Sequence, residues 1–120
     1  MNEEPPPSDA RPGSVAHHGH VVEILLPLYD SEGTRIPGSL FDEVSAELTD
    51  LFGGVTAFVR SPAVGGWRDL EGKVERDDVV LFEVMTGALD QRWWARYRVR
   101  LERRFGQKEI MVRATSVERL

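Results

Sequence analysis

The chain has 120 residues and a mass of 13.5 kDa, with 41% hydrophobic and 29% charged residues. This is the size and composition of a single globular domain. Because it contains no cysteine, a disulfide scaffold, a thiol nucleophile and a cysteine-ligated zinc or iron–sulfur site are excluded. The net charge of −5, from 15 basic and 20 acidic residues, argues against a general nucleic-acid coat, since such proteins bind by neutralising phosphates.

Residues 1–20 differ in composition from the rest of the chain, because they hold four prolines and all three histidines but little that a core could bury. Such a segment does not recover the entropy of ordering, so we expect a disordered tail followed by one domain at 21–120. The tail has neither the basic start nor the apolar stretch of a secretory signal. The longest apolar run, 24–29, is far shorter than the ~18–20 residues that cross a bilayer. We therefore expect a cytoplasmic protein without membrane contact.

The first expected element of the domain is a strand at 21–29, since this apolar run is too short and too branched for a helix. Pro27 belongs near the end of the strand, because it has no amide hydrogen to donate to a sheet ladder. A turn is expected at 30–33, where the residues are Asp, Ser, Glu and Gly.

A helix is expected at 39–52, because apolar residues recur there on one face at helical spacing. Ser39 would cap its start, and Asp42 would complete a signature like a capping box. The pair Gly53-Gly54 would end the helix in a left-handed cap.

The second half of the chain contains the same kinds of element. The helix expected there carries an apolar stripe made of Trp94, Tyr97, Leu101 and Phe105, and Gly106 would end it. The remaining expected elements are strands at 55–60, 79–85 and 110–117, a helix at 90–105 and a long connection at 61–77. This connection is either a loop or, in the favoured interpretation, a hairpin extended by its arms 67–69 and 73–75.

The expected order is therefore strand, helix, strand, strand, helix, strand, which is the split β-α-β pattern of ferredoxin-like folds. Right-handed crossovers would place both helices on the same face of the sheet. We predict an α+β fold, a ferredoxin-like βαββαβ domain whose four-stranded antiparallel sheet has the strand order 4-1-3-2.

The other face of such a sheet is bare, and the alternation of side chains along each strand assigns its residues. If Val22, Ile24 and Leu26 face the helices, apolar residues of all four strands point outward. A contiguous apolar patch beyond a few hundred Å² marks a partner or ligand site. Homodimerisation through this face is one interpretation, and a small apolar ligand held between the sheet and the long connection is the other. The expected interface or ligand residues are Val21, Leu25, Tyr29, Phe58, Leu81, Met85 and Met111, with Trp67 folding over the face or its edge.

The same face is expected to carry one charged residue from each strand, and these would form a row if the registers align. As a structural feature the row is a ladder of ion pairs, each worth roughly 0.2–1 kcal/mol. As a chemical feature, two adjacent carboxylates could act as an acid–base pair. The ladder is the favoured interpretation, so the catalytic candidates are not assigned firmly. They are Glu23, Glu83, Arg113 and Arg60.

The second helix is rich in arginine, with Arg92, Arg96, Arg100 and Arg103 lining the face opposite Trp94. A solvated face paired with acidic neighbours explains this basic stripe. The alternative is contact with phosphates or a nucleic acid. No aromatic residue interleaves the exposed arginines to stack on bases, which argues against nucleic acid.

The three histidines, His17, His18 and His20, could bind a transition metal through their imidazoles. They fall in the expected tail, with no neighbouring carboxylate to orient the rings, so we interpret such affinity as adventitious. Because the chain has no other histidine, a Ser-His-Asp triad is excluded. We expect neither a cofactor nor a physiological metal.

Several spaced pieces of the sequence resemble a family of small bacterial proteins that has no established activity. The resemblance covers 21–117 and implies a ferredoxin-like α+β fold, without catalytic residues to transfer. The matching pieces are Ile24–Pro27, Leu51-Phe52-Gly53-Gly54 with Thr56, Gly66-Trp67, Asp78 before the third strand, and Phe105-Gly106-Gln107 before Ile110.

Taken together, the sequence favours a non-catalytic binding or assembly module that forms a homodimer through its open sheet face. The alternative is a small enzyme of the dimeric α/β-barrel type, with a pocket under Trp67 and the pair Glu23 and Glu83 as acid and base. A second alternative is phosphate or nucleic-acid contact through the arginine-rich helix.

Overall fold

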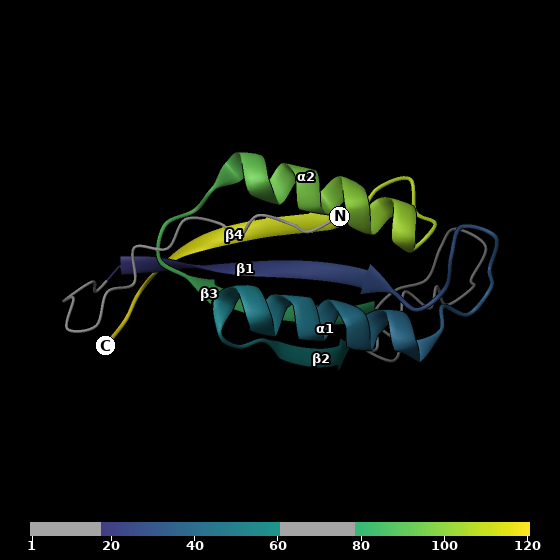
Figure 1. Cartoon of the computed structure of the whole chain (residues 1–120), viewed down its shortest axis with the longest axis horizontal. Coiled ribbons are helices and arrows are strands. Elements are labelled where there is room, and N and C mark those ends of the chain that lie inside the picture. Colours follow the sequence, from purple (N-terminus) through teal and green to yellow (C-terminus); the bar gives the residue numbers. More distant parts are fainter. Residues whose placement is uncertain (1–17, 61–78) are drawn as a thin grey trace, which may run out of the picture.

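The computed structural model describes residues 18–60 and 79–120 of the chain. It is an α+β structure in which two helices lie against a four-stranded antiparallel sheet (Figure 1). The strands follow the order β2-β3-β1-β4, which is the predicted order read from the opposite edge. The elements are β1 (His18–Pro27), α1 (Gly38–Phe52), β2 (Thr56–Arg60), β3 (Val79–Thr86), α2 (Gln91–Arg104) and β4 (Met111–Glu118).

Strand β1 begins three residues before its predicted start and ends at Pro27 rather than at Tyr29. Its early start comes from pairing with β4, where His18 lies opposite Glu118. The last three residues of the predicted tail are thus part of the sheet, and residues 1–17 lie outside the described residues. Pro27 stands at the strand's end, as its missing amide hydrogen predicts.

The turn predicted after β1 is confirmed, and Asp30 organises it. One carboxylate oxygen of Asp30 accepts hydrogen bonds from the backbone amides of Glu32 and Thr34, both at 2.9 Å. Gly33 adopts a φ of 84°, which a residue without a Cβ reaches at no steric cost. The turn accounts for Asp30 without any chemical role.

The predicted cap of α1 is wrong, although the predicted C-terminal end is right. Pro37 is the last extended residue, so α1 begins at Gly38, and no side chain caps it. Ser39 therefore lies inside the first turn instead of before it, where a capping hydroxyl has to stand. Gly53, with φ of 82°, ends α1 by donating its amide hydrogen to the carbonyl of Thr49 at 2.8 Å.

Helix α2 has the side-chain cap that α1 lacks. Asp90 precedes the helix and accepts a hydrogen bond from the backbone amide of Trp93 at 3.1 Å. The helix ends at Arg104, and Gly106 follows with a φ of 61°. Both boundaries lie within one residue of the predicted span.

One hydrophobic core joins both helices to the same face of the sheet, because inward residues of β1 and β3 pack in it with residues of α1 and α2 (Figure 1). The predicted alternation is confirmed on this side, since Val22, Ile24 and Leu26 are all buried. The buried residues from the other elements are Val44 and Leu48 of α1, Val80, Phe82 and Val84 of β3, and Trp93, Trp94, Tyr97 and Leu101 of α2.

Stacked aromatic rings join the two helices within this core. Phe52 of α1 stacks on Trp94 with ring centroids 5.2 Å apart, and Trp93 stacks on Tyr97 at 5.0 Å. Trp93 is only 2% exposed, although the predicted stripe of α2 did not include it. Its spacing of four residues from Tyr97, and of eight from Leu101, is the signal that places it on the buried face.

Hydrogen bonds also join the two helices, and they meet at Glu47 of α1. The hydroxyl of Tyr97 donates to Glu47 of α1 at 3.0 Å, and Arg104 donates to both oxygens of that carboxylate, at 3.0 and 2.6 Å. Burial first, and then the negative charge of Glu47, raise the pKa of the Tyr97 hydroxyl above its ordinary value of 10.0. The hydrogen bond to Glu47 also raises the pKa of the Arg104 guanidinium.

The raised pKa of Tyr97 predicts an alkaline loss of stability. The folded state holds this proton more tightly than the unfolded state, so its contribution is complete below pH 10.0 and falls as the pH rises toward the folded-state pKa. Removing the hydroxyl in Tyr97→Phe should cost about 1 kcal/mol of unfolding free energy at neutral pH. Between about pH 8 and about pH 11, the advantage of the natural chain over this variant should shrink by ~1 kcal/mol. Urea unfolding of both chains measures this difference in unfolding free energy. A difference that stays constant across this pH range contradicts the account.

Candidate functional site: the open sheet face

The face of the sheet turned away from the helices, here called the open sheet face, carries a row of four apolar residues. Leu25 of β1 lies opposite Leu81 of β3 and Met111 of β4, and Leu81 lies opposite Phe58 of β2. The row therefore crosses all four strands. Its outer members are well exposed, with Phe58 at 45% and Met111 at 55%, whereas Leu81 is buried at 6%.

A shorter row lies four residues earlier on β1. There Val21 stands opposite Met85 of β3 and Thr115 of β4. Met85 is 51% exposed, and Val21 is half-buried. The predicted outward set on β1, β3 and β4 is thus found on one face.

Between these rows lies the charged row, in which Arg113, Glu23 and Glu83 stand side by side on β4, β1 and β3. The guanidinium of Arg113 donates to Glu23 through its Nε at 3.0 Å. The row ends at Thr56 on β2, so the prediction that Arg60 completes it is wrong. Strand β2 enters the sheet at Thr56, and Arg60 is four residues further on, opposite Val79.

The two glutamates are direct neighbours, which is the arrangement that the acid–base hypothesis requires. Like charges directly opposite each other destabilise a sheet, and Arg113 offsets this on the Glu23 side. Within the described part of the chain, no residue forms an ion pair with Glu83. The geometry therefore supports a single ion pair at Glu23 and leaves the Glu83 carboxylate without a cation among the described residues.

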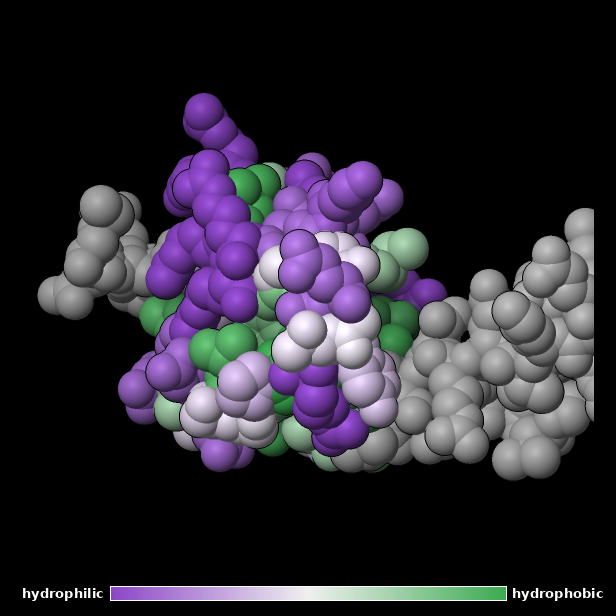
Figure 2. Space-filling view, turned by 90° about the vertical axis from the view of Figure 1, so that its right-hand side faces the viewer, coloured by the Kyte–Doolittle hydropathy of each residue, from purple (hydrophilic) through white to green (hydrophobic). Residues whose placement is uncertain are grey.

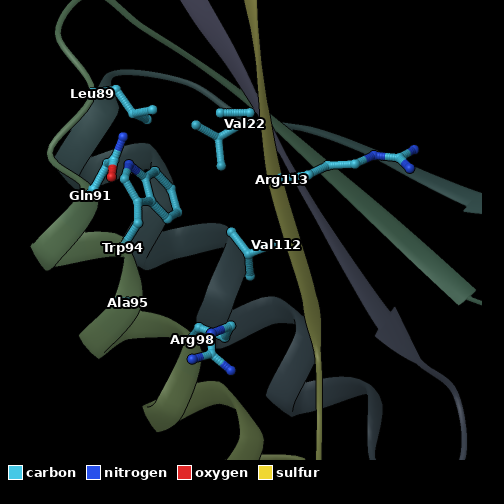
Figure 3. Close-up of a pocket in the computed structure, with 9 residues that line it drawn as sticks. Val22, Leu89, Gln91, Trp94, Ala95, Arg98, Val112 and Arg113 are labelled. Atoms are coloured by element: carbon cyan, nitrogen blue, oxygen red, sulfur yellow. The ribbon is translucent and has the colours of Figure 1, made fainter.

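A cavity of about 250 Å³ lies on the other side of the sheet, between α2 and β4, and neither glutamate lines it. In Figure 3 the side chains of Val22, Val112 and Trp94 point into this space, while that of Arg113 extends away from it across β4. Arg113 thus contributes only its backbone side to the cavity, and its guanidinium belongs to the open sheet face.

Of the other two residues expected on the open sheet face, the structure describes only Tyr29. Trp67, and with it the pocket expected beneath it, lies outside the described residues. Tyr29 follows the end of β1, where it forms an isolated bridge with Arg35, whose guanidinium lies 5.6 Å from the centre of its ring. Tyr29 is therefore part of the turn region, at the end of the sheet.

The arginines of α2 divide into two groups. Arg98 pairs with Glu102 at 3.0 Å, and Arg104 pairs with Glu47. In the predicted basic stripe, Arg100 lies over the ring of Tyr97 at 5.8 Å, and Arg92, Arg96 and Arg103 are exposed.

Seen from the end of the molecule at the right of Figure 1, hydrophilic side chains cover much of the surface, and hydrophobic ones emerge in separate areas (Figure 2).

The histidines occupy the first part of β1, apart from His17, which lies outside the described residues. His20 donates a hydrogen bond through its ring Nδ1 to the carbonyl of Gly87 at 2.8 Å. Residues 18–60 and 79–120 contain no group of three or more histidine, aspartate or glutamate side chains placed to hold a metal ion.

Comparison with protein-family models, with curated proteins and with solved structures finds no match to this chain. None of the helices in the described ranges has the length and apolar character needed to cross a bilayer. The interpretation of the site therefore depends on its own geometry.

Proposed function

We propose that the protein is a binding or assembly module that acts without catalysis and forms a homodimer through its open sheet face. The observation that supports this best is the continuous row of Met111, Leu25, Leu81 and Phe58, whose two ends are about half exposed. Met85 lies beyond the charged row and adds a second apolar area to the same face. Contiguous apolar surface of this kind is typical of an interaction site.

The energetics indicate what such a dimer needs beyond apolar contact. Burying a whole Phe or Met side chain contributes roughly 1.5–3 kcal/mol, so each half-exposed member contributes roughly half of that. Phe58, Met85 and Met111 of two copies then give roughly 5–9 kcal/mol. Association costs about 4–15 kcal/mol in lost freedom of motion, so this contribution is only comparable to the cost. The remaining surface has to add favourable contacts, and the charged row is its main feature.

The charged row favours a second copy of this chain as the partner. It has a cation at one end, Arg113, and toward the other end a carboxylate, Glu83, that pairs with no cation among residues 18–60 and 79–120. A two-fold axis that runs along β1 between two facing sheets reverses the row of one copy over the other. Each Arg113 then faces the Glu83 of the other copy. The two Glu23 carboxylates face each other across the axis, and each keeps the ion pair with its own Arg113. The same operation brings Met111 over Leu81, which joins the apolar rows.

Charging the apolar row should separate the copies. The double variant Phe58→Glu with Met111→Glu is predicted to sediment as a monomer at concentrations where the natural chain is a dimer, because four charges would have to be buried in the interface. Val99→Glu is the matched control, since Val99 is an exposed apolar residue on α2, away from this face. Sedimentation equilibrium measures all three chains. A natural chain that stays monomeric at ~100 µM, where a standard interface is largely formed, would contradict the proposal.

Charge reversal tests the pairing of the rows. Glu83→Arg and Arg113→Glu should each weaken the dimer, because like charges then face each other across the interface. An equimolar mixture of the two variants should form a heterodimer, since every reversed charge meets an opposite one. Native mass spectrometry separates the three species by mass. If the mixture contains no heterodimer although both chains are folded, this two-fold arrangement is excluded.

We also propose that the described strands and helices form a ferredoxin-like βαββαβ domain, as the resemblance to small bacterial proteins implies. The element order and the strand order β2-β3-β1-β4 support this. In such a domain the helices connect parallel strands by right-handed crossovers on one face. The opposite face is then free to pair with a second copy.

A further inference from the structure

The cavity between α2 and β4 has a lining that the proposed dimer does not use. Its wall on α2 consists of residues that share one helix face, at spacings of three and four: Gln91, Trp94, Ala95 and Arg98. The opposite wall is formed by Val112 and Ala114, which alternate on the helix side of β4, and by Val22 of β1. Leu89 closes the end beside Gln91 (Figure 3).

Small side chains explain why the space exists. Ala95 of the helix and Ala114 of the strand both line the cavity, and larger side chains at these positions would occupy part of the space. The cavity measures about 250 Å³, which is room for about eight water molecules at ~30 Å³ each. Drug-sized ligands occupy roughly 300–1,000 Å³, so the space fits one small organic molecule.

The cavity is apolar in its middle and polar at its two ends. Trp94, buried at 6% exposure, presents its ring beside Val22 and Val112. Gln91 lies at one end and Arg98 at the other, as Figure 3 shows. A few polar groups around an apolar body are the usual composition of a small-molecule site.

Arg98 identifies the charge of the ligand. Its side chain is 40% exposed and donates to Glu102 through one terminal nitrogen at 3.0 Å. A guanidinium has five N–H donors, so the remaining ones can bind a second acceptor. Glu102 is held in place from the other side, because the same oxygen accepts the backbone amide of Ile110 at 3.0 Å. Arg98 is thus a positioned cation at the mouth of an apolar cavity.

We propose that this cavity binds a small monocarboxylate with an aromatic or branched apolar body. The body lies against Trp94 between Ala95 and Ala114, and the carboxylate accepts hydrogen bonds from Arg98. The neighbouring Arg92 and Arg96 of α2 add positive potential, which favours an anion. This site is independent of the dimer, because it lies on the opposite side of the sheet.

The test uses the full chain and 3-phenylpropionate as the probe, with its neutral amide for comparison. Binding is followed by ¹H–¹⁵N NMR, and the expected result is saturable shifts at Ala95, Val112, Ala114 and the Trp94 indole at up to ~10 mM probe. The amide should bind about tenfold more weakly, since it lacks the charge that Arg98 pairs with. Absence of saturable shifts at these residues, or equal binding of acid and amide, overturns the proposal.

Three variants and one control variant separate this site from non-specific binding. Arg98→Gln should weaken binding of the probe about tenfold, whereas Arg103→Gln, an exposed arginine of the same helix outside the cavity lining, should change it less than twofold. Glu102→Gln should tighten binding, because it releases Arg98 from its internal partner and still accepts the Ile110 amide. Ala114→Leu fills the cavity at an exposed strand position and should abolish the shifts, with thermal unfolding confirming that the chain is folded. Unchanged binding in Arg98→Gln or in folded Ala114→Leu excludes this site.

Discussion

The position of β1 between two antiparallel neighbours is the constraint on which the structure depends. Each residue of β1 from His20 to Leu25 has a partner on both β3 and β4, so the register of three strands is fixed together. A slip by one residue would turn every buried side chain of β1 to the other face. Because Val22, Ile24 and Leu26 are needed in the core, Glu23 and Leu25 have to lie on the open sheet face. The charged row and the apolar row both follow from the burial of these three β1 side chains on the helix side of the sheet.

The parts of the fold that depend on local pattern could be predicted from the sequence, and those that depend on pairing could not. Alternation in β1 and helical spacing in α1 identified the core, and Gly53 marked the end of a helix. The register of β2 is set by its pairing with β3, so nothing local to Arg60 indicated that Thr56 would stand opposite Glu83. Ser39 does not occupy the capping position because α1 begins one residue earlier than predicted, at Gly38, directly after Pro37.

The candidate sites follow the same division. Each residue of the apolar row was predicted from the sequence, but the alignment of these residues across four strands depends on how the strands pair. The cavity was not predicted, since its lining comes from segments that are distant in the sequence, among them two alanines of α2 and β4. Strand β4 links both sites, because Met111 and Arg113 point to the open sheet face while Val112 and Ala114 line the cavity.

The central claim is that the open sheet face is covered by a second copy of the chain, and methionine oxidation tests it most directly. Met85 and Met111 stand on this face on different strands, about half exposed in a single chain. Peptide mass spectrometry after brief peroxide treatment, with the unfolded chain as reference, measures the rate at each site. The account predicts that both methionines become protected together as the protein concentration rises into the range where the dimer forms. Rates that stay fast and independent of concentration at both sites would contradict it.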